Sequence, residues 1–155
     1  SKSHLSRFER GQKALSVAAL LRLSDELGVP ISAILSDEVQ ESDLSVRRSS
    51  KLEYKPISDR LDGPEFAMLR GGHDTGSLEL IYLKIPANQR TPEPAHHHGR
   101  EGLFVTVGAV YLTAEGSKAC LLKAGDFAEF DASRHHIIEG TDMDSELLLM
   151  VLPNY

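Results

Sequence analysis

Apolar positions in the first third of the chain follow a helical repeat. Between residues 14 and 27, apolar side chains recur every three or four positions, a spacing typical of an amphipathic helix. Ser16 is suited to be its N-cap, and Gly28 is suited to the left-handed turn that ends a helix. The pattern therefore predicts a capped helix over this segment.

Two shorter helices are expected on either side of it. Residues 31–35 are apolar enough for one turn or more, with Ser32 as the candidate cap. Residues 3–10 form the earlier segment, in which Phe8 would face inward and Gly11 would stop the helix. The start of the chain is therefore predicted to be all-α.

The pattern changes after a polar stretch that has no sustained period. Beyond it, short apolar or alternating runs are separated by turn residues, and no helical run interrupts them. The expected strands are 66–69, 78–85, 103–112, 119–122, 127–130, 136–138 and 147–152. Short strands at this spacing predict an antiparallel sandwich or barrel. The division expected is a helical part at 1–36, a linker at 37–50 and a β domain at 51–155.

Composition narrows the function classes. The net charge of -6 opposes a protein that coats nucleic acid over its whole surface, although one element can still be basic. Cys120 is the only cysteine, so no internal disulfide forms. No apolar run approaches the ~20 residues of a membrane span, and the first ten residues are too polar for a signal peptide. A soluble, cytoplasmic protein is expected.

Residues 3–13, SHLSRFERGQK, resemble the recognition helix and following turn of lambda-repressor-like (XRE) helix-turn-helix regulators. The two helices expected downstream fit the fourth and fifth helices of that family. The family places this helix in the DNA major groove, and four cations between residues 2 and 13 are consistent with that role. By this resemblance, the residues that face bases are Lys2, Ser3, His4 and Arg7. Those near phosphates are Arg10, Gln12 and Lys13.

The XRE family has two further helices ahead of its recognition helix. This chain begins where those helices would have ended. The expectation is therefore that the sequence is an N-terminally truncated piece of a longer regulator.

A histidine run marks the β domain. The segment from His96 to Gly108 resembles the first cupin motif, with Glu101 and Gly108 at the spacing of that motif. The segment from Gly125 to His136 resembles the second motif, and His136 stands where the family has its last metal-binding histidine. The resemblance implies a cupin fold, a double-stranded β-helix or jelly-roll-like barrel.

The same motifs suggest a divalent metal site. Two histidines one residue apart on a strand share a face, and nitrogen and oxygen ligands suit Zn, Ni, Mn, Fe or Co. The expected ligands are His96, His98, Glu101 and His136, with His97 as a substitute. The spacing leaves the choice among the three histidines open, because the loop to Glu101 is short for the family. Regulatory cupins often lack metal, so a metal-free pocket is the alternative.

These features together favour a transcription regulator. The expected protein is not an enzyme; it is a homodimer that binds double-stranded operator DNA and senses a small-molecule effector in its barrel. Three arginines are candidates for an anionic effector because guanidinium grips carboxylates: Arg60, Arg70 and Arg90. The alternatives are a metal-dependent cupin dioxygenase or isomerase with a helical appendage, and an antitoxin-like protein-interaction module.

Overall fold

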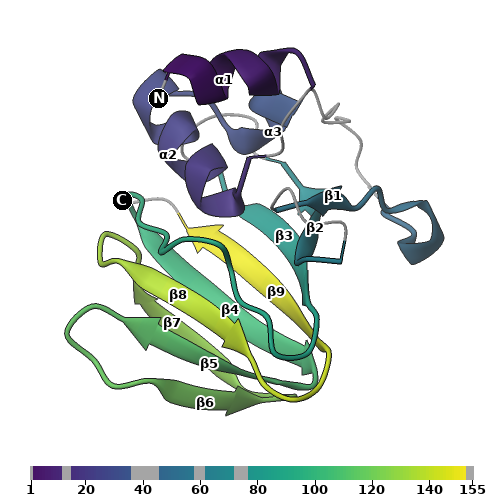
Figure 1. Cartoon of the computed structure of the whole chain (residues 1–155), viewed down its shortest axis with the longest axis vertical. Coiled ribbons are helices and arrows are strands. Elements are labelled where there is room, and N and C mark those ends of the chain that lie inside the picture. Colours follow the sequence, from purple (N-terminus) through teal and green to yellow (C-terminus); the bar gives the residue numbers. More distant parts are fainter. Residues whose placement is uncertain (1, 12–14, 36–45, 58–61, 72–76, 153–155) are drawn as a thin grey trace.

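Helices lie across one end of a two-sheet barrel (Figure 1). The computed structural model describes residues 2–11, 15–35, 46–57, 62–71 and 77–152. The fold is mainly β, a cupin-type jelly roll with a small N-terminal helical region. No helix in these described residues is long and apolar enough to span a membrane.

The three predicted helices are confirmed. They are α1 (Lys2–Glu9), α2 (Val17–Leu27) and α3 (Ile31–Leu35). The Ser16 side chain accepts a hydrogen bond from the Ala19 amide at 3.1 Å, and Gly28 ends α2 in the left-handed conformation with φ 64°. These caps satisfy backbone groups that the helix itself leaves unpaired.

The expected role of Ser32 as a cap is wrong. Ser32 lies inside α3 and is buried, with 1% of its surface exposed. The Ile31 amide at the start of α3 instead donates to the carboxylate of Glu79, which belongs to the barrel, at 2.8 Å. The barrel therefore supplies the polar partner for the first turn of this helix.

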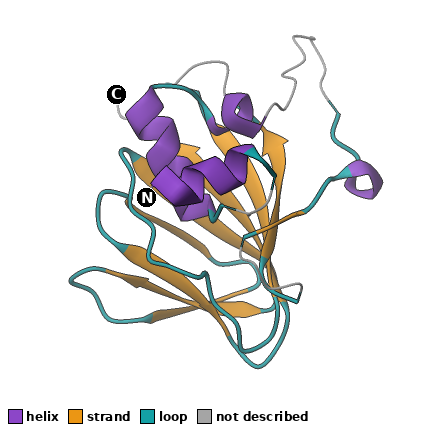
Figure 2. Cartoon of the chain, turned by 45° about the horizontal axis from the view of Figure 1, so that its top comes forward, coloured by secondary structure: helices purple, strands orange, loops and turns teal. Residues whose placement is uncertain are grey.

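The barrel consists of two sheets covered at one end by the helices (Figure 2). Nine strands lie in the residues that the structure describes. They are β1 (Lys55–Pro56), β2 (Glu65–Arg70), β3 (Glu79–Ile85), β4 (Arg100–Val107), β5 (Ala109–Ala114), β6 (Cys120–Lys123), β7 (Phe127–Asp131), β8 (His136–Gly140) and β9 (Ser145–Leu152). One sheet has the order β1-β2-β3-β9-β4-β7 and the other β6-β5-β8, and all described pairings are antiparallel. A short 3₁₀ turn at Ser49–Lys51 precedes β1.

The single strand expected over 103–112 is two strands in different sheets. Gly108 separates β4 from β5 and has φ 75°, a conformation that costs glycine little. A side chain there would also meet the Asp144 carbonyl at 2.4 Å. The apolar pattern of the sequence continues across Gly108 because both β4 and β5 direct apolar side chains into the core, so the sequence gives no sign of the break.

Helices and barrel share one hydrophobic core. Val17, Leu20 and Leu21 of α2 and Ile31 of α3 belong to the same buried cluster as the barrel strands. The packing is close where α3 meets Gly71, because a Cβ atom at Gly71 would lie 2.2 Å from the Ser32 Cβ. The helical region is thus fixed on the barrel by continuous burial.

Candidate functional site

The histidine run lies in the loop before β4, not on a strand. The expectation that alternate residues share a face therefore does not apply to it. His97 points inward, with 4% of its surface exposed, whereas His98 is exposed. His96 stacks on His135, with ring centroids 4.4 Å apart. The structure thus brings neither His96 nor His98 to Glu101, and the substitute His97 occupies that place.

Three buried side chains converge at the base of this loop. His97 Nε2 lies 2.9 Å from Glu101 Oε2, and His136 Nε2 lies 3.3 Å from the same oxygen. Glu101 is on β4 and His136 begins β8, so both sheets contribute. We call His97, Glu101 and His136 the triad. Among the described residues, it is the only group of three or more potential metal ligands whose ligand atoms lie close enough together to hold one ion.

Backbone carbonyls orient both imidazoles of the triad. His97 Nδ1 lies 3.0 Å from the His98 carbonyl, and His136 Nδ1 lies 2.9 Å from the Arg134 carbonyl. A carbonyl only accepts, so each Nδ1 carries a hydrogen and each Nε2 is directed at Glu101. Metal-binding histidines are commonly fixed in this way. The donor set and its support therefore fit a divalent ion held by three protein ligands, with further positions open.

The triad is electrostatically coupled. Burial alone would raise the pKa of Glu101, but hydrogen bonds and charge from His136 and His97 outweigh it and hold this pKa at about 2. Burial likewise acts to lower the pKa of His97, and the hydrogen bond and charge of Glu101 reverse that effect and raise it. In the metal-free protein the carboxylate is therefore ionised and favours the protonated imidazole.

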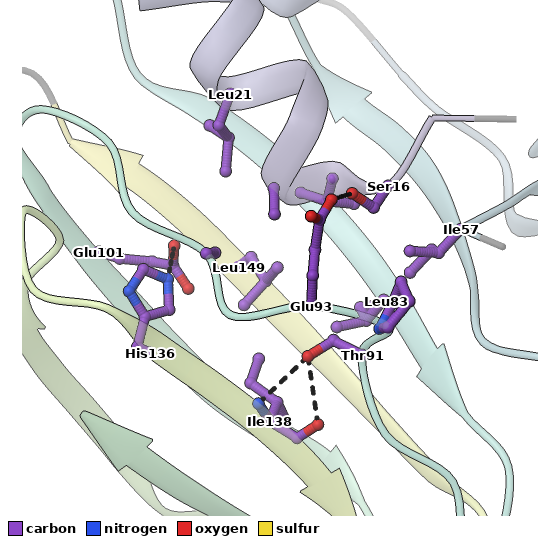
Figure 3. A pocket seen from close by; sticks show the side chains of 14 residues that line it. Ser16, Leu21, Ile57, Leu83, Thr91, Glu93, Glu101, His136, Ile138 and Leu149 are labelled. Atoms are coloured by element: carbon purple, nitrogen blue, oxygen red, sulfur yellow. Dashed lines mark hydrogen bonds and ion pairs between the residues drawn. The ribbon is translucent and has the colours of Figure 1, made fainter. Parts of the chain in front are cut away.

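Two residues of the triad, Glu101 and His136, face a cavity beneath α2 (Figure 3). Glu101 and His136 line one part of it, while Ser16, Val17 and Leu21 line the opposite part from α2 and its cap. The cavity measures about 400 Å³, its open mouth included. The helical region therefore forms one wall of the space that Glu101 and His136 face.

Polar contacts hold α2 at the rim of this cavity. Glu93, on the loop before the histidines, accepts a hydrogen bond from Ser16 Oγ at 2.5 Å and pairs with Arg22 at 3.3 Å. Farther along the helix, the Asp25 carboxylate accepts a hydrogen bond from the His98 amide at 2.9 Å. The loop that carries His97 is thus tied directly to α2.

The arginines expected to bind an anionic effector are not brought into the cavity where the structure describes them. Arg70 is exposed at the end of β2. Arg90 is exposed and pairs with Glu139 at 3.8 Å. Arg60 lies outside the described residues. Arg70 and Arg90 thus lie on the surface of the barrel, outside the lining of this cavity, and their role at an effector stays a prediction.

The residues expected to contact DNA lie on α1 or just after it. Arg7 on α1 and Arg10 directly after it are exposed. Lys2, Ser3 and His4 are in the first turn of α1, whereas Gln12 and Lys13 lie outside the described residues. Their role at DNA stays a prediction.

Sequence reasoning missed the residues that join α2 to the barrel. Ser16 was expected only as a cap, and Glu93 was not singled out. Their contact spans 77 positions of sequence, and no local periodicity reports such a pairing. The only local sign is that a charged residue, Glu93, stands between two prolines ahead of the histidine run.

Comparison with known proteins decides the nature of the barrel. Residues 81–152 match the family model described as a cupin domain. This part of the chain therefore resembles a cupin domain in sequence as well as in fold. No curated protein matches the chain. Both predicted motifs fall inside the matched residues, so the predicted cupin resemblance is confirmed.

Solved structures extend the likeness to the helices. An HTH_3 family transcriptional regulator from Vibrio cholerae superposes with a TM-score of 0.71 at 19% identity, covering 99% of this chain and 82% of that one. A predicted oxalate decarboxylase from Thermotoga maritima has a TM-score of 0.61 at 26% identity, covering 71% of this chain and 100% of that one. The cupin domain of an XRE family regulator from Enterobacter cloacae has a TM-score of 0.54 at 10% identity, covering 60% and 99%. The resemblance to helix-turn-helix regulators with a cupin domain is confirmed as a likeness of fold.

Proposed function

We propose that this protein is a DNA-binding transcription regulator whose cupin domain senses a small molecule. The observation that carries the proposal is the position of α2, which joins the helical region to the triad's cavity as one of its walls. A ligand in that cavity would contact the part of the chain that resembles a DNA-binding fold. The likeness to the Vibrio cholerae regulator supports this reading because it includes the helices.

The proposal includes a homodimer and a divalent metal. Regulators with paired recognition helices read two half-sites, which a two-fold dimer matches. A metal held by the triad would leave coordination positions that a polar group of the effector can fill. His96 and His98, the first-choice ligands by sequence, are replaced in this proposal by His97.

A metal-dependent cupin enzyme is the second candidate. Its support is the same triad, together with the likeness of the cupin domain to a predicted oxalate decarboxylase. An enzyme of this kind would not need α1 to contact DNA. The two candidates therefore differ in whether α1 binds DNA.

Selection from a random library of double-stranded DNA, with the protein at its full natural length, tests the proposal. Enrichment of a palindromic sequence is expected, because a two-fold dimer reads inverted half-sites. Arg7→Ala should weaken binding to that sequence about tenfold or more. Arg90→Ala is the matched control, since Arg90 is an exposed arginine on the barrel. Failure to enrich any sequence, with turnover of a metabolite by the metal-loaded protein, would establish the enzyme instead.

A further inference from the structure

The cavity has walls from two parts of the chain that are far apart in sequence. Ser16, Val17, Ala18 and Leu21 contribute from the helical side, and Glu101 and His136 from the barrel. We propose that this space is a composite binding site for a compact aliphatic molecule with one polar end, and that α2 is its movable wall. This inference rests on the proposed function and specifies how its effector site works.

The lining determines the class of ligand. Most described side chains around the cavity are aliphatic, including Leu21, Ile57, Leu83, Ile138 and Leu149. Such a lining favours an apolar body, because burying it removes apolar surface from water. The polar groups of the lining include Glu101 and His136 of the triad, together with Glu93 and Thr91 (Figure 3). A bound molecule would therefore direct its polar end toward one of these groups.

Glu93 joins α2 to the barrel through two polar contacts, with Ser16 and with Arg22, which we call the latch. One of its oxygens, Oε1, contacts both Ser16 Oγ at the cap of α2 and Arg22 Nη2 six residues later. The side chains of the Arg22–Glu93 pair are partly exposed, at 34% and 44%. A pair this exposed contributes modestly to stability. The latch therefore adds little to the docking of α2, and the buried contacts of Leu20 and Leu21 make the larger contribution that a movement of α2 must overcome.

A ligand that touches both walls would stabilise the docked position of α2. Its binding energy is lost when the walls separate, so binding and docking are linked. Phe8 of α1 packs against the same hydrophobic core as α2. Movement of α2 would therefore also change the packing and position of α1. The signal would then pass through direct contact and would not need the linker between the two parts.

Hydrogen–deuterium exchange of α2 amides measures this docking. An undocked helix of 11 residues is marginal in water, so its amides exchange when α2 leaves the barrel. The probes are butanol, butylamine and butyrate, which share an aliphatic body and differ in the polar end. At about ten times the dissociation constant, a probe that binds should slow exchange in 17–27 about tenfold. Strands β5 and β6 are the internal reference, because they lie outside the cavity lining.

Two variants test the latch separately. Glu93→Gln should speed exchange in α2 about two- to fivefold, because it removes the charge that pairs with Arg22. Glu65→Gln is the matched control: it removes the carboxylate paired with Lys84 on the barrel surface and should leave α2 unchanged. Equal exchange in both variants, or no protection by any of the three probes, would overturn the inference.

The experiment separates this inference from the proposed function because it contains no DNA. If the protein selects DNA but no probe slows amide exchange in α2, the composite site is refuted and the proposed function is not. If a probe slows amide exchange in α2 but the protein selects no DNA, the proposed regulator is refuted and the composite site is supported.

Discussion

His97 and His98 are neighbours with opposite surroundings, which makes them a matched pair of variants. His97 is buried beside Glu101, and His98 presents its ring to solvent. We expect His97→Ala to lower bound divalent metal to about a tenth or less of the parent, because a ligand is lost. His98→Ala should keep the metal content of the parent. Elemental mass spectrometry on untagged protein measures both, and equal loss in the two variants would contradict the assignment of the triad.

Stability of the metal-free protein should depend on pH through the same residues. The pKa of Glu101 is about 2 in the folded protein against an ordinary 4.5, so its contribution is present above pH 4.5 and is lost as pH falls toward 2. The pKa of His97 is raised, so its contribution is present below its ordinary pKa of 6.5 and is lost as pH rises through the folded value. Urea unfolding after chelation should show a maximum between these limits. Glu101→Gln should flatten the curve, and an unchanged curve would show that the pair is not coupled.

Single residues also mark the limit of what the sequence predicts. Glu101 and His136 were identified because the cupin motifs fix their positions on β4 and β8. The sequence does not decide which of the three histidines points inward, because the run lies in a loop and no regular alternation of side chains applies there. Only the three-dimensional structure shows that the His97 ring turns inward, where its Nδ1 donates to the His98 carbonyl.

At the scale of elements, the docking of α3 depends on one glycine. Gly71→Ala would place a Cβ atom 2.2 Å from the Ser32 Cβ, so α3 must move away from β2. We expect a loss of about 1–3 kcal/mol in the free energy of unfolding. Thermal and urea unfolding measure the loss, and faster exchange of α3 amides would locate it. Ser32→Gly in the same chain should restore part of the stability, which a purely local effect at residue 71 would not allow.

Elements themselves were well predicted where their pattern is local. The caps Ser16 and Gly28 and the alternation in β3 are short-range signals, and both elements are observed. The corner at Gly108 was missed because both flanking strands are apolar. The partner of α3, Glu79, was missed because it is 48 positions away from Ile31.

For the whole molecule, the proposed homodimer needs an apolar face on the barrel. Phe127 on β7 is 53% exposed and, with Met150 of β9, lies over Gly102 of β4 on the outside of the six-stranded sheet. If a second copy covers this face, Phe127→Asp should raise the dimer dissociation constant about tenfold or more, because an unpaired charge is buried. Leu121→Asp is the control, since Leu121 is 42% exposed on the other sheet. Sedimentation measures both, and a dimer weakened only by the control would move the interface to the smaller sheet.

The shared core and the contacts around Glu93 have a consequence for the history of this protein. A change on α2 alters the environment of residues on the barrel, so the two parts cannot diverge independently. Among homologues, positions 16, 22 and 93 should vary together, as should positions 32 and 71. Relatives that lack the helices should carry polar residues at positions 57 and 83, which in this chain line the cavity beneath α2 with apolar side chains.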